Sequence, residues 1–194
     1  GIAPIAVKYG KGVYLYDYDD KKIIDFSSGL MNVNIGHGDQ RITDAVVKQM
    51  KAVSYVTPSC VTEVRGELGK KLAEICPGDL NKAFFTLCGA TSIENAIKLA
   101  RLYTGRHKIL SRYQSYHGAS IGAISASGDP RRIAVDAQQA PNFIHFDLPY
   151  AYRWGYGEEN MLKESVAQLE RMIAYEAPGN IAAILLEGES GSSG

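Results

Sequence analysis

The stretch KAFFTLCGATSIENAIKLARLYTGRHKILSR, residues 82–112, decides the fold class. It opens with a continuous apolar run at 82–87, which is typical of a strand buried on both faces of a parallel sheet. Apolar residues then recur at helical spacing over 90–103, and a second short strand is predicted at 108–112. Strands and helices that alternate in this way predict an α/β layer with a mainly parallel sheet.

The alternation continues to the end of the chain. Periodicity and turn residues predict a small-residue helix, a strand, a second helix and a final buried strand, at 120–127, 142–146, 159–176 and 181–187. We therefore expect a mainly parallel sheet with flanking helices in this half of the chain.

The first part of the chain has a different pattern. Residues 13–26 alternate apolar and polar side chains around an Asp-Asp turn, which predicts a β-hairpin. The stretch 27–38 is rich in Gly and Asn and is typical of a loop. Amphipathic helices are predicted at 40–53, with Asp39 as N-cap, and at 61–76.

Composition and charge argue against several classes of function. The chain has 194 residues, enough for one domain or slightly more, and its 21 basic and 21 acidic residues give a formal net charge of zero. Binding to nucleic acid or to an anionic membrane surface needs a basic excess, so we expect neither partner. The three cysteines form no CxxC pair, which argues against a disulfide framework and against a zinc site. We expect no metal, and a reducing cytoplasm as the compartment.

Three loops follow predicted strands, at the edge where open parallel sheets bind ligands. The first, Leu87–Ser92, leads into a helix whose free amides predict a phosphate site, or else it is an ordinary turn with Ser92 or Thr91 as a cap. The second holds Tyr116 and His117, which either stack on a flat heterocycle or merely pack. The third begins at Glu187, a carboxylate that is either satisfied structurally or placed for function.

A fourth loop, residues 147–157, is rich in aromatic side chains. Its aromatic run is more typical of a subunit contact than of a platform for a sugar or a base; the residues are Tyr150, Tyr152, Trp154 and Tyr156.

The order of these segments is itself informative. The hairpin is followed by DFSSGLMNVNIGH (25–37), CGATSIENAIKLAR (88–101), SYHGAS (115–120) and AAILLEGESGSSG (182–194). Together they resemble the class III aminotransferases, which are pyridoxal phosphate (PLP) enzymes of fold type I, over essentially all of residues 11–194. The resemblance implies the α/β fold of the PLP-dependent transferases. Residues 1–38 would form an N-terminal hairpin segment in the small domain, and residues 39–194 the first part of the large cofactor-binding domain.

The resemblance also implies which residues bind the cofactor. The backbone amides of Gly89 and Ala90 match the pair that holds the cofactor phosphate. Ala90 stands where the family usually has Ser or Thr, and the hydroxyl of Thr91 or Ser92 is expected to compensate. In the second loop, the pyridine ring stacks on an aromatic residue within a Tyr-His-Gly segment; the matching residues are Tyr116, His117 and Gly118.

Three further residues match positions near the substrate. Met31 lines the substrate pocket, and Tyr55 belongs to a region that reaches the partner subunit's site. Glu187 matches the acid that opens a Glu-Pro-Val loop near the cofactor, and we expect it to be catalytic. The family's cofactor-holding lysine and the aspartate that binds the pyridine nitrogen follow this loop. We therefore expect both beyond Gly194, and we expect the chain to be a fragment.

The function implied is transfer of an amino group from an amine or ω-amino acid to a keto acid through PLP, by a cytoplasmic homodimer. Two alternatives remain open at this point. One is a PLP-dependent mutase or decarboxylase on the same fold. The other is a non-catalytic α/β module that binds a phosphate ligand or a protein partner.

Overall fold

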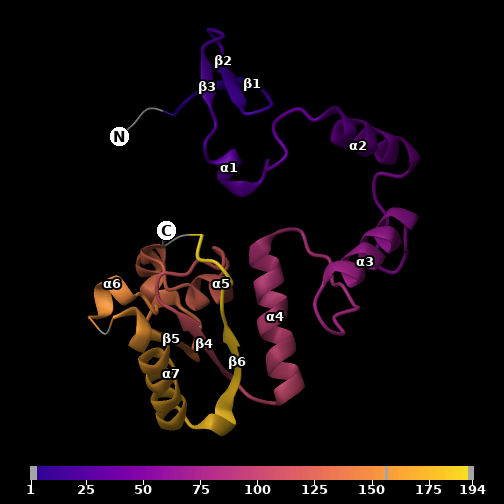
Figure 1. Ribbon diagram of the computed structural model, residues 1–194. Helices are drawn as coiled ribbons and strands as arrows, with labels where there is room; N and C mark the ends of the chain where they lie inside the picture. The colour runs from indigo at the N-terminus through magenta and orange to yellow at the C-terminus, as the bar shows by residue number, and fades with distance from the viewer. Residues whose placement is uncertain (1–3, 156, 192–194) are drawn as a thin grey trace. The chain divides into compact units, whose positions relative to one another are not determined.

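The computed structural model describes residues 4–155 and 157–191. The chain divides into two compact units, Gly1–Ala83 and Phe84–Gly194 (Figure 1). Tyr156 of the aromatic loop and residues 192–194 of the C-terminal loop lie outside the described residues. The domain boundary expected after residue 38 concerns a complete enzyme and stays a prediction.

The first unit begins with a three-stranded antiparallel sheet of order β1-β2-β3, formed by Val7–Lys11, Tyr14–Asp17 and Lys22–Ile24. The predicted hairpin is confirmed as β2 and β3. At its turn, the Asp17 carboxylate accepts hydrogen bonds from the amides of Asp19 and Lys21. Strand β1 was not predicted, and it pairs with β2 so that the rings of Tyr9 and Tyr16 stack at 4.5 Å.

His37 ties the end of the loop that follows the sheet back to the sheet. His37 pairs through its backbone with Gly12, and its Nε2 lies 2.8 Å from Oδ2 of Asp25. This interaction lowers the pKa of the Asp25 carboxyl. The loop itself contains one short helical turn, α1 (Ser28–Met31), in which Leu30 has a positive φ.

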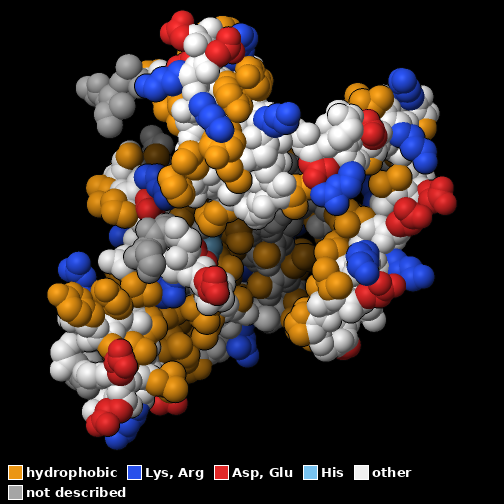
Figure 2. All heavy atoms as spheres, turned by 45° about the horizontal axis from the view of Figure 1, so that its top comes forward, with side chains coloured by type: hydrophobic (Ala, Val, Ile, Leu, Met, Phe, Trp, Pro, Cys, Tyr) orange, Lys and Arg blue, Asp and Glu red, His pale blue; other side chains and the backbone are white. Residues whose placement is uncertain are grey.

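Two amphipathic helices follow, α2 (Gln40–Ala52) and α3 (Glu63–Ile75). The predicted cap is confirmed because the Asp39 side chain accepts a hydrogen bond from the Arg41 amide. Neither helix buries a residue within the part of the chain that the structure describes. Hydrophobic side chains therefore remain on the surface (Figure 2), and on α2 they include Ile42, Val46 and Met50.

The second unit is an α/β layer built on a three-stranded parallel sheet of order β5-β4-β6, formed by Phe143–Phe146, Lys108–Arg112 and Ile181–Leu185. Figure 1 shows this sheet between α4 (Gly89–Thr104) and α7 (Glu158–Tyr175). Shorter elements complete the unit: α5 (Ile121–Ala126), α6 (Ala151–Trp154) and the 3₁₀ turns η1 (Pro130–Gln138) and η2 (Pro178–Asn180).

The core of this unit forms where α4 and α5 meet the central strand. Ile97, Ile109 and Ala126 are buried together there. Strand β4 lies between two parallel neighbours, so its residues Leu110 and Ser111 are completely buried. The predicted α/β class and parallel sheet are confirmed.

The buried strand predicted at 82–87 is wrong. No strand forms there, and the side chains of Phe84 and Leu87 are 71% and 99% exposed. A strand is stable only when a neighbour satisfies its backbone donors and acceptors, and residues 82–87 pair with neither edge of the sheet in the described residues. An apolar run indicates that a segment is favoured in a buried position, but it does not show that a neighbouring strand is present to pair with it.

Within the described ranges, none of the helices is both long and apolar enough to cross a lipid bilayer.

Candidate functional site

The first predicted loop is a helix N-terminus. Helix α4 begins at Gly89, one residue before the predicted start at residue 90. Cys88 before it is in an extended conformation and makes no side-chain capping hydrogen bond. A Cβ added to Gly89 would meet no atom within 4 Å. The first amides of a helix lack intrahelical acceptors and lie at the positive end of its dipole. This end of α4 is therefore an open site for an anion, with Thr91 in its first turn.

Groups at this helix end also act on the thiol of Cys88. Its Sγ lies 3.3 Å from Oγ1 of Thr91. The hydrogen bond from the Thr91 side chain, together with the amides of Thr91 and Ala90, lowers the pKa of the Cys88 thiol. The same groups would stabilise a phosphate.

A glycine brings the second loop against the first. Gly118 has a φ of +138°, and a Cβ there would lie 2.6 Å from the Cβ of Ala90. Only a residue without a side chain allows this approach. The structure thus places the Tyr116–Gly118 segment directly on the first turn of α4.

Glu187 joins the third loop to the second. Its Oε1 accepts a hydrogen bond from the Tyr116 amide at 3.0 Å, and its Oε2 accepts one from Nη2 of Arg112 at 3.2 Å. The side chains of Arg112 and Glu187 are only 11% and 18% exposed. Both carboxylate oxygens are engaged, so the geometry shows Glu187 holding the loop. Its expected catalytic role stays a prediction.

His117 is built into the fold by its backbone. Its amide donates to Oγ of Ser127 at 2.8 Å, and that hydroxyl donates to the carbonyl of Ala123. The ring is buried, and its Nε2 has no hydrogen-bond partner among the described residues. Burial lowers the pKa of the His117 imidazole, while Glu187 opposes this shift. The ring is therefore neutral at pH 7.

The Tyr116 ring is partly exposed, at 36%. The guanidinium of Arg131 lies over it, 3.7 Å from the ring centroid, and is held there by Asp129 at 2.6 Å. One face of the ring is covered by this cation–π contact. A flat heterocycle would therefore stack on the other face.

Met31 and Tyr55 belong to the first unit. Their side chains are 64% and 78% exposed, and the backbone of Met31 has a positive φ of 64°. Their predicted roles in substrate binding stay predictions.

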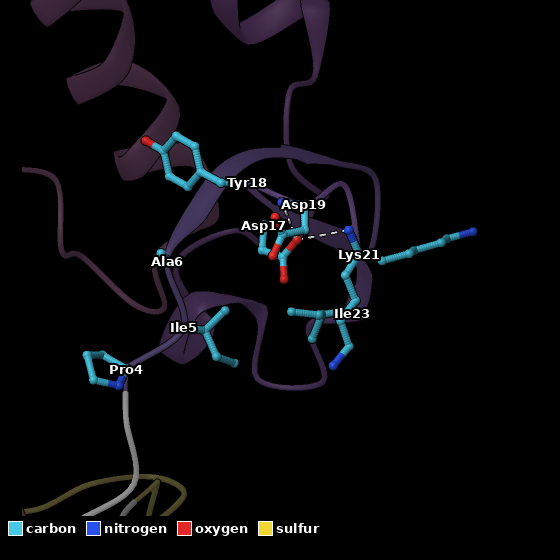
Figure 3. Close-up of a pocket in the computed structure, with 9 residues that line it drawn as sticks. Pro4, Ile5, Ala6, Asp17, Tyr18, Asp19, Lys21 and Ile23 are labelled. Carbon is cyan, nitrogen blue, oxygen red and sulfur yellow. Dashed lines mark hydrogen bonds between the residues drawn. The ribbon is translucent and has the colours of Figure 1, made fainter.

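Two cavities among the described residues are lined by other side chains. The first unit has a hollow of about 540 Å³ beside its sheet (Figure 3), where the Asp17 carboxylate is already bound by turn amides. It is lined by Pro4, Ile5, Ala6, Asp17, Tyr18, Asp19, Lys21, Lys22 and Ile23. A smaller one, of about 160 Å³, follows the ends of β4 and β5 and is lined by Tyr113, Gln114, Asp147, Leu148, Tyr150 and Arg153. None of the predicted site residues lines either cavity.

Sequence reasoning missed two residues that organise the site. Arg112 pairs with Glu187 across 75 positions of the chain, and Glu94 binds the segment after Gly118 across 26 to 29 positions. Arg112 could have been found from its place at the end of a predicted strand, because a charged residue there is buried only with a partner.

The residues present fit PLP at both of its ends. The open N-terminus of α4 suits the phosphate, because the first amides of a helix lack intrahelical acceptors. Tyr116 is partly exposed and its backbone amide is held by Glu187, so its ring suits the flat heterocycle. The two features are joined by the contact between Ala90 and Gly118.

Comparisons with known proteins identify the family. The family model described as aminotransferase class-III matches residues 2–194. An uncharacterized aminotransferase of Bacillus subtilis, YodT, is 35% identical over 97% of this chain and 44% of its own length. The acetylornithine aminotransferase of Bacillus amyloliquefaciens is 31% identical over 98% of this chain and 74% of its own length.

The chain is also similar to solved structures of aminotransferases. A taurine:2-oxoglutarate aminotransferase from Bifidobacterium kashiwanohense, in complex with PLP and glutamate, is 40% identical with a TM-score of 0.91, over 96% of this chain and 43% of its own. An (S)-enantioselective omega-transaminase from Thermomicrobium roseum is 39% identical with a TM-score of 0.89, over 94% and 43%. The chain thus spans less than half the length of most of these relatives.

Proposed function

Because the chain belongs to the aminotransferase class-III family, we propose that the whole protein transfers an amino group from an amine or ω-amino acid to a keto acid with the help of PLP. The observation that carries this proposal is the convergence of three loops at one site. Gly118 packs on Ala90, and Glu187 binds the Tyr116 amide. These contacts join an anion site, an aromatic ring and a fixed carboxylate at the carboxyl ends of β4 and β6.

Each loop has a distinct task in this proposal. The amides of Gly89 and Ala90, with the hydroxyl of Thr91, bind the phosphate group and so anchor the cofactor at the positive end of α4. Tyr116 orients the ring by stacking, and Arg131 on its other face keeps the tyrosine ring from rotating away. When bound, PLP supplies the electron sink and carries the amino group.

The remaining residues set the geometry and charge around the ring. Glu187 fixes the Tyr116 backbone, and Arg112 neutralises the carboxylate from inside the sheet. His117, buried and neutral, supports the loop without adding charge beside the cofactor. Met31 and Tyr55 are proposed to contact the substrate.

The test is PLP binding to the whole protein, with a graded series at Tyr116. Aromatic stacking contributes about 0.5–1.5 kcal/mol beyond burial, which corresponds to about 2- to 13-fold in affinity. We expect Tyr116→Phe to bind PLP nearly as tightly as wild type, and Tyr116→Ala to bind it at least that much more weakly. Absorbance titration gives the affinity, and transamination of candidate amines with 2-oxoglutarate or pyruvate gives the activity.

The exposed tyrosine of α4 provides the control. Tyr103 is 94% exposed at the far end of the helix, and Tyr103→Ala should leave PLP affinity unchanged. Equal affinities for wild type, Tyr116→Phe and Tyr116→Ala would remove Tyr116 from the site. Absence of PLP binding by the wild type would contradict the proposed function.

We also propose a cytoplasmic homodimer with two-fold symmetry. Two observations support it: Tyr150 and Tyr152 are exposed in the aromatic loop, and the three cysteines are free. Light scattering on the whole protein tests the dimer, and a stable active monomer would contradict it.

A further inference from the structure

One face of α4 contacts the segment that follows the Tyr116 loop. Ala90 and Glu94 are four residues apart and therefore lie on the same side of the helix. Ala90 meets Gly118, and Glu94 reaches three groups between residues 120 and 123. The first two turns of α4 thus hold the whole segment from residue 118 to residue 123.

A single oxygen of Glu94 makes all three hydrogen bonds. Its Oε1 accepts from Oγ of Ser120 at 2.6 Å, from the amide of Gly122 at 2.8 Å and from the amide of Ala123 at 3.1 Å. These amides belong to the first turn of α5, whose N-cap Ser120 makes no side-chain capping bond of its own. Glu94 therefore supplies from α4 the cap that α5 lacks.

Gly122 shows how closely the carboxylate is seated. A Cβ at this position would overlap Oε2 of Glu94. The end of a flexible side chain would normally move aside, but three hydrogen bonds restrain this one. The carboxylate and the glycine therefore form a matched pair.

We propose that Glu94 is a positioning residue for the cofactor, because it fixes the distance between the phosphate-binding amides of α4 and the ring of Tyr116. The inference rests on the proposed function, whose two binding features lie on α4 and on this segment. Glu187 holds the segment from β6 at the Tyr116 end, and Glu94 holds it from α4 at the Ala123 end. The hydrogen bonds of Glu94 go to Ser120, Gly122 and Ala123 rather than to the phosphate site or the ring.

The test compares Glu94→Gln and Glu94→Ala in the whole protein, without substrate. Glutamine keeps Oε1 as acceptor for all three donors, whereas alanine removes it. We expect Glu94→Ala to raise the dissociation constant for PLP roughly tenfold. This is the lower end of the loss of affinity seen at metal sites when a residue that holds a metal ligand in place is mutated. Glu94→Gln should stay within about twofold of wild type, and so should Glu170→Ala, which removes an exposed glutamate on α7.

A double-mutant cycle with Gly122→Ala isolates the contact. In the wild-type background, Gly122→Ala displaces the carboxylate and should weaken PLP binding as Glu94→Ala does. In the Glu94→Ala background, the same change should have no further effect on PLP affinity, because the atom it would strike is gone.

The outcomes separate the inference from the proposed function. If the wild type binds PLP and folded Glu94→Ala binds it equally tightly, with only its unfolding midpoint lowered, Glu94 is purely structural and the inference is wrong. Additive effects of Glu94→Ala and Gly122→Ala on PLP affinity would also overturn it. If the wild type binds no PLP, the proposed function fails, and the inference fails with it.

Discussion

Replacing Gly118 by alanine should destabilise the second unit strongly. The new Cβ would lie 2.6 Å from the Cβ and 2.8 Å from the Cα of Ala90, so backbone has to move. Overpacking of this kind costs about 1–3 kcal/mol, and a non-glycine residue at a φ of +138° costs about 1–3 kcal/mol more. The lower entropy of the unfolded alanine chain returns about 0.4–1 kcal/mol. The free energy of unfolding should therefore fall by about 1–6 kcal/mol.

Urea unfolding of the cofactor-free whole protein measures this change, and Gly89→Ala is the matched control. Its Cβ meets no atom within 4 Å, so the Gly89→Ala protein should be as stable as wild type or up to about 1 kcal/mol more stable. That Cβ instead enters the space assigned to the phosphate and should weaken PLP binding. A Gly118→Ala protein as stable as the Gly89→Ala protein would refute the close contact between the Tyr116 loop and α4.

Three other changes probe the same site. Iodoacetamide at about pH 7 should modify Cys88 faster than the exposed Cys60, because the Thr91 side chain and the first amides of α4 lower the pKa of the Cys88 thiol. Thr91→Val should slow the reaction at Cys88, and added phosphate should slow it more than sodium chloride of equal ionic strength does. Mass spectrometry of the labelled peptides measures both rates, and an unchanged rate in both experiments would contradict the prediction. The His117 pKa in the folded protein lies below its unfolded value of about 6.5, so between the two values the unfolded chain binds more protons and the free energy of unfolding falls as pH drops. In urea titrations from about pH 7.5 to 5.5, His117→Asn should make the free energy of unfolding depend less on pH. An unchanged pH dependence would show that other groups cause it. Glu187→Ala leaves Arg112 nearly buried without its partner and should cost about 3–5 kcal/mol, whereas Glu187→Gln keeps an acceptor for the Tyr116 amide and should cost less; equal losses in the two unfolding curves would contradict the role given to that hydrogen bond.

The sequence predicted best what local spacing determines. Helices α2, α3, α4 and α7 were predicted within a few residues, because each repeats apolar positions at helical period between recognisable ends. The start of α4 at Gly89 followed from the turn before it. These features depend on neighbours along the chain.

The features that the sequence did not predict depend on residues that are distant in the chain but close in space. The run at 82–87 looked like a strand, but pairing decides strand formation, and its pattern contained no information about a partner. Strand β1 contains Gly10, which weakens its strand pattern, and it is stabilised by pairing with β2.

The candidate site was predicted in part for the same reason. The resemblance brought forward Gly89, Tyr116 and Glu187 as single residues. The contacts between them, and the roles of Arg112 and Glu94, arise from hydrogen bonds that span 26 to 75 positions. Such pairs have no periodic signature in one sequence.

A crystal structure of the whole protein loaded with PLP is the decisive measurement for the proposed cofactor site. We expect phosphate oxygens at hydrogen-bond distance, about 2.7–3.2 Å, from the amides of Gly89 and Ala90. We also expect the pyridine ring stacked on the face of Tyr116 that Arg131 leaves open. A phosphate held elsewhere, with the N-terminus of α4 unused and Tyr116 out of contact with the ring, would contradict the proposed site.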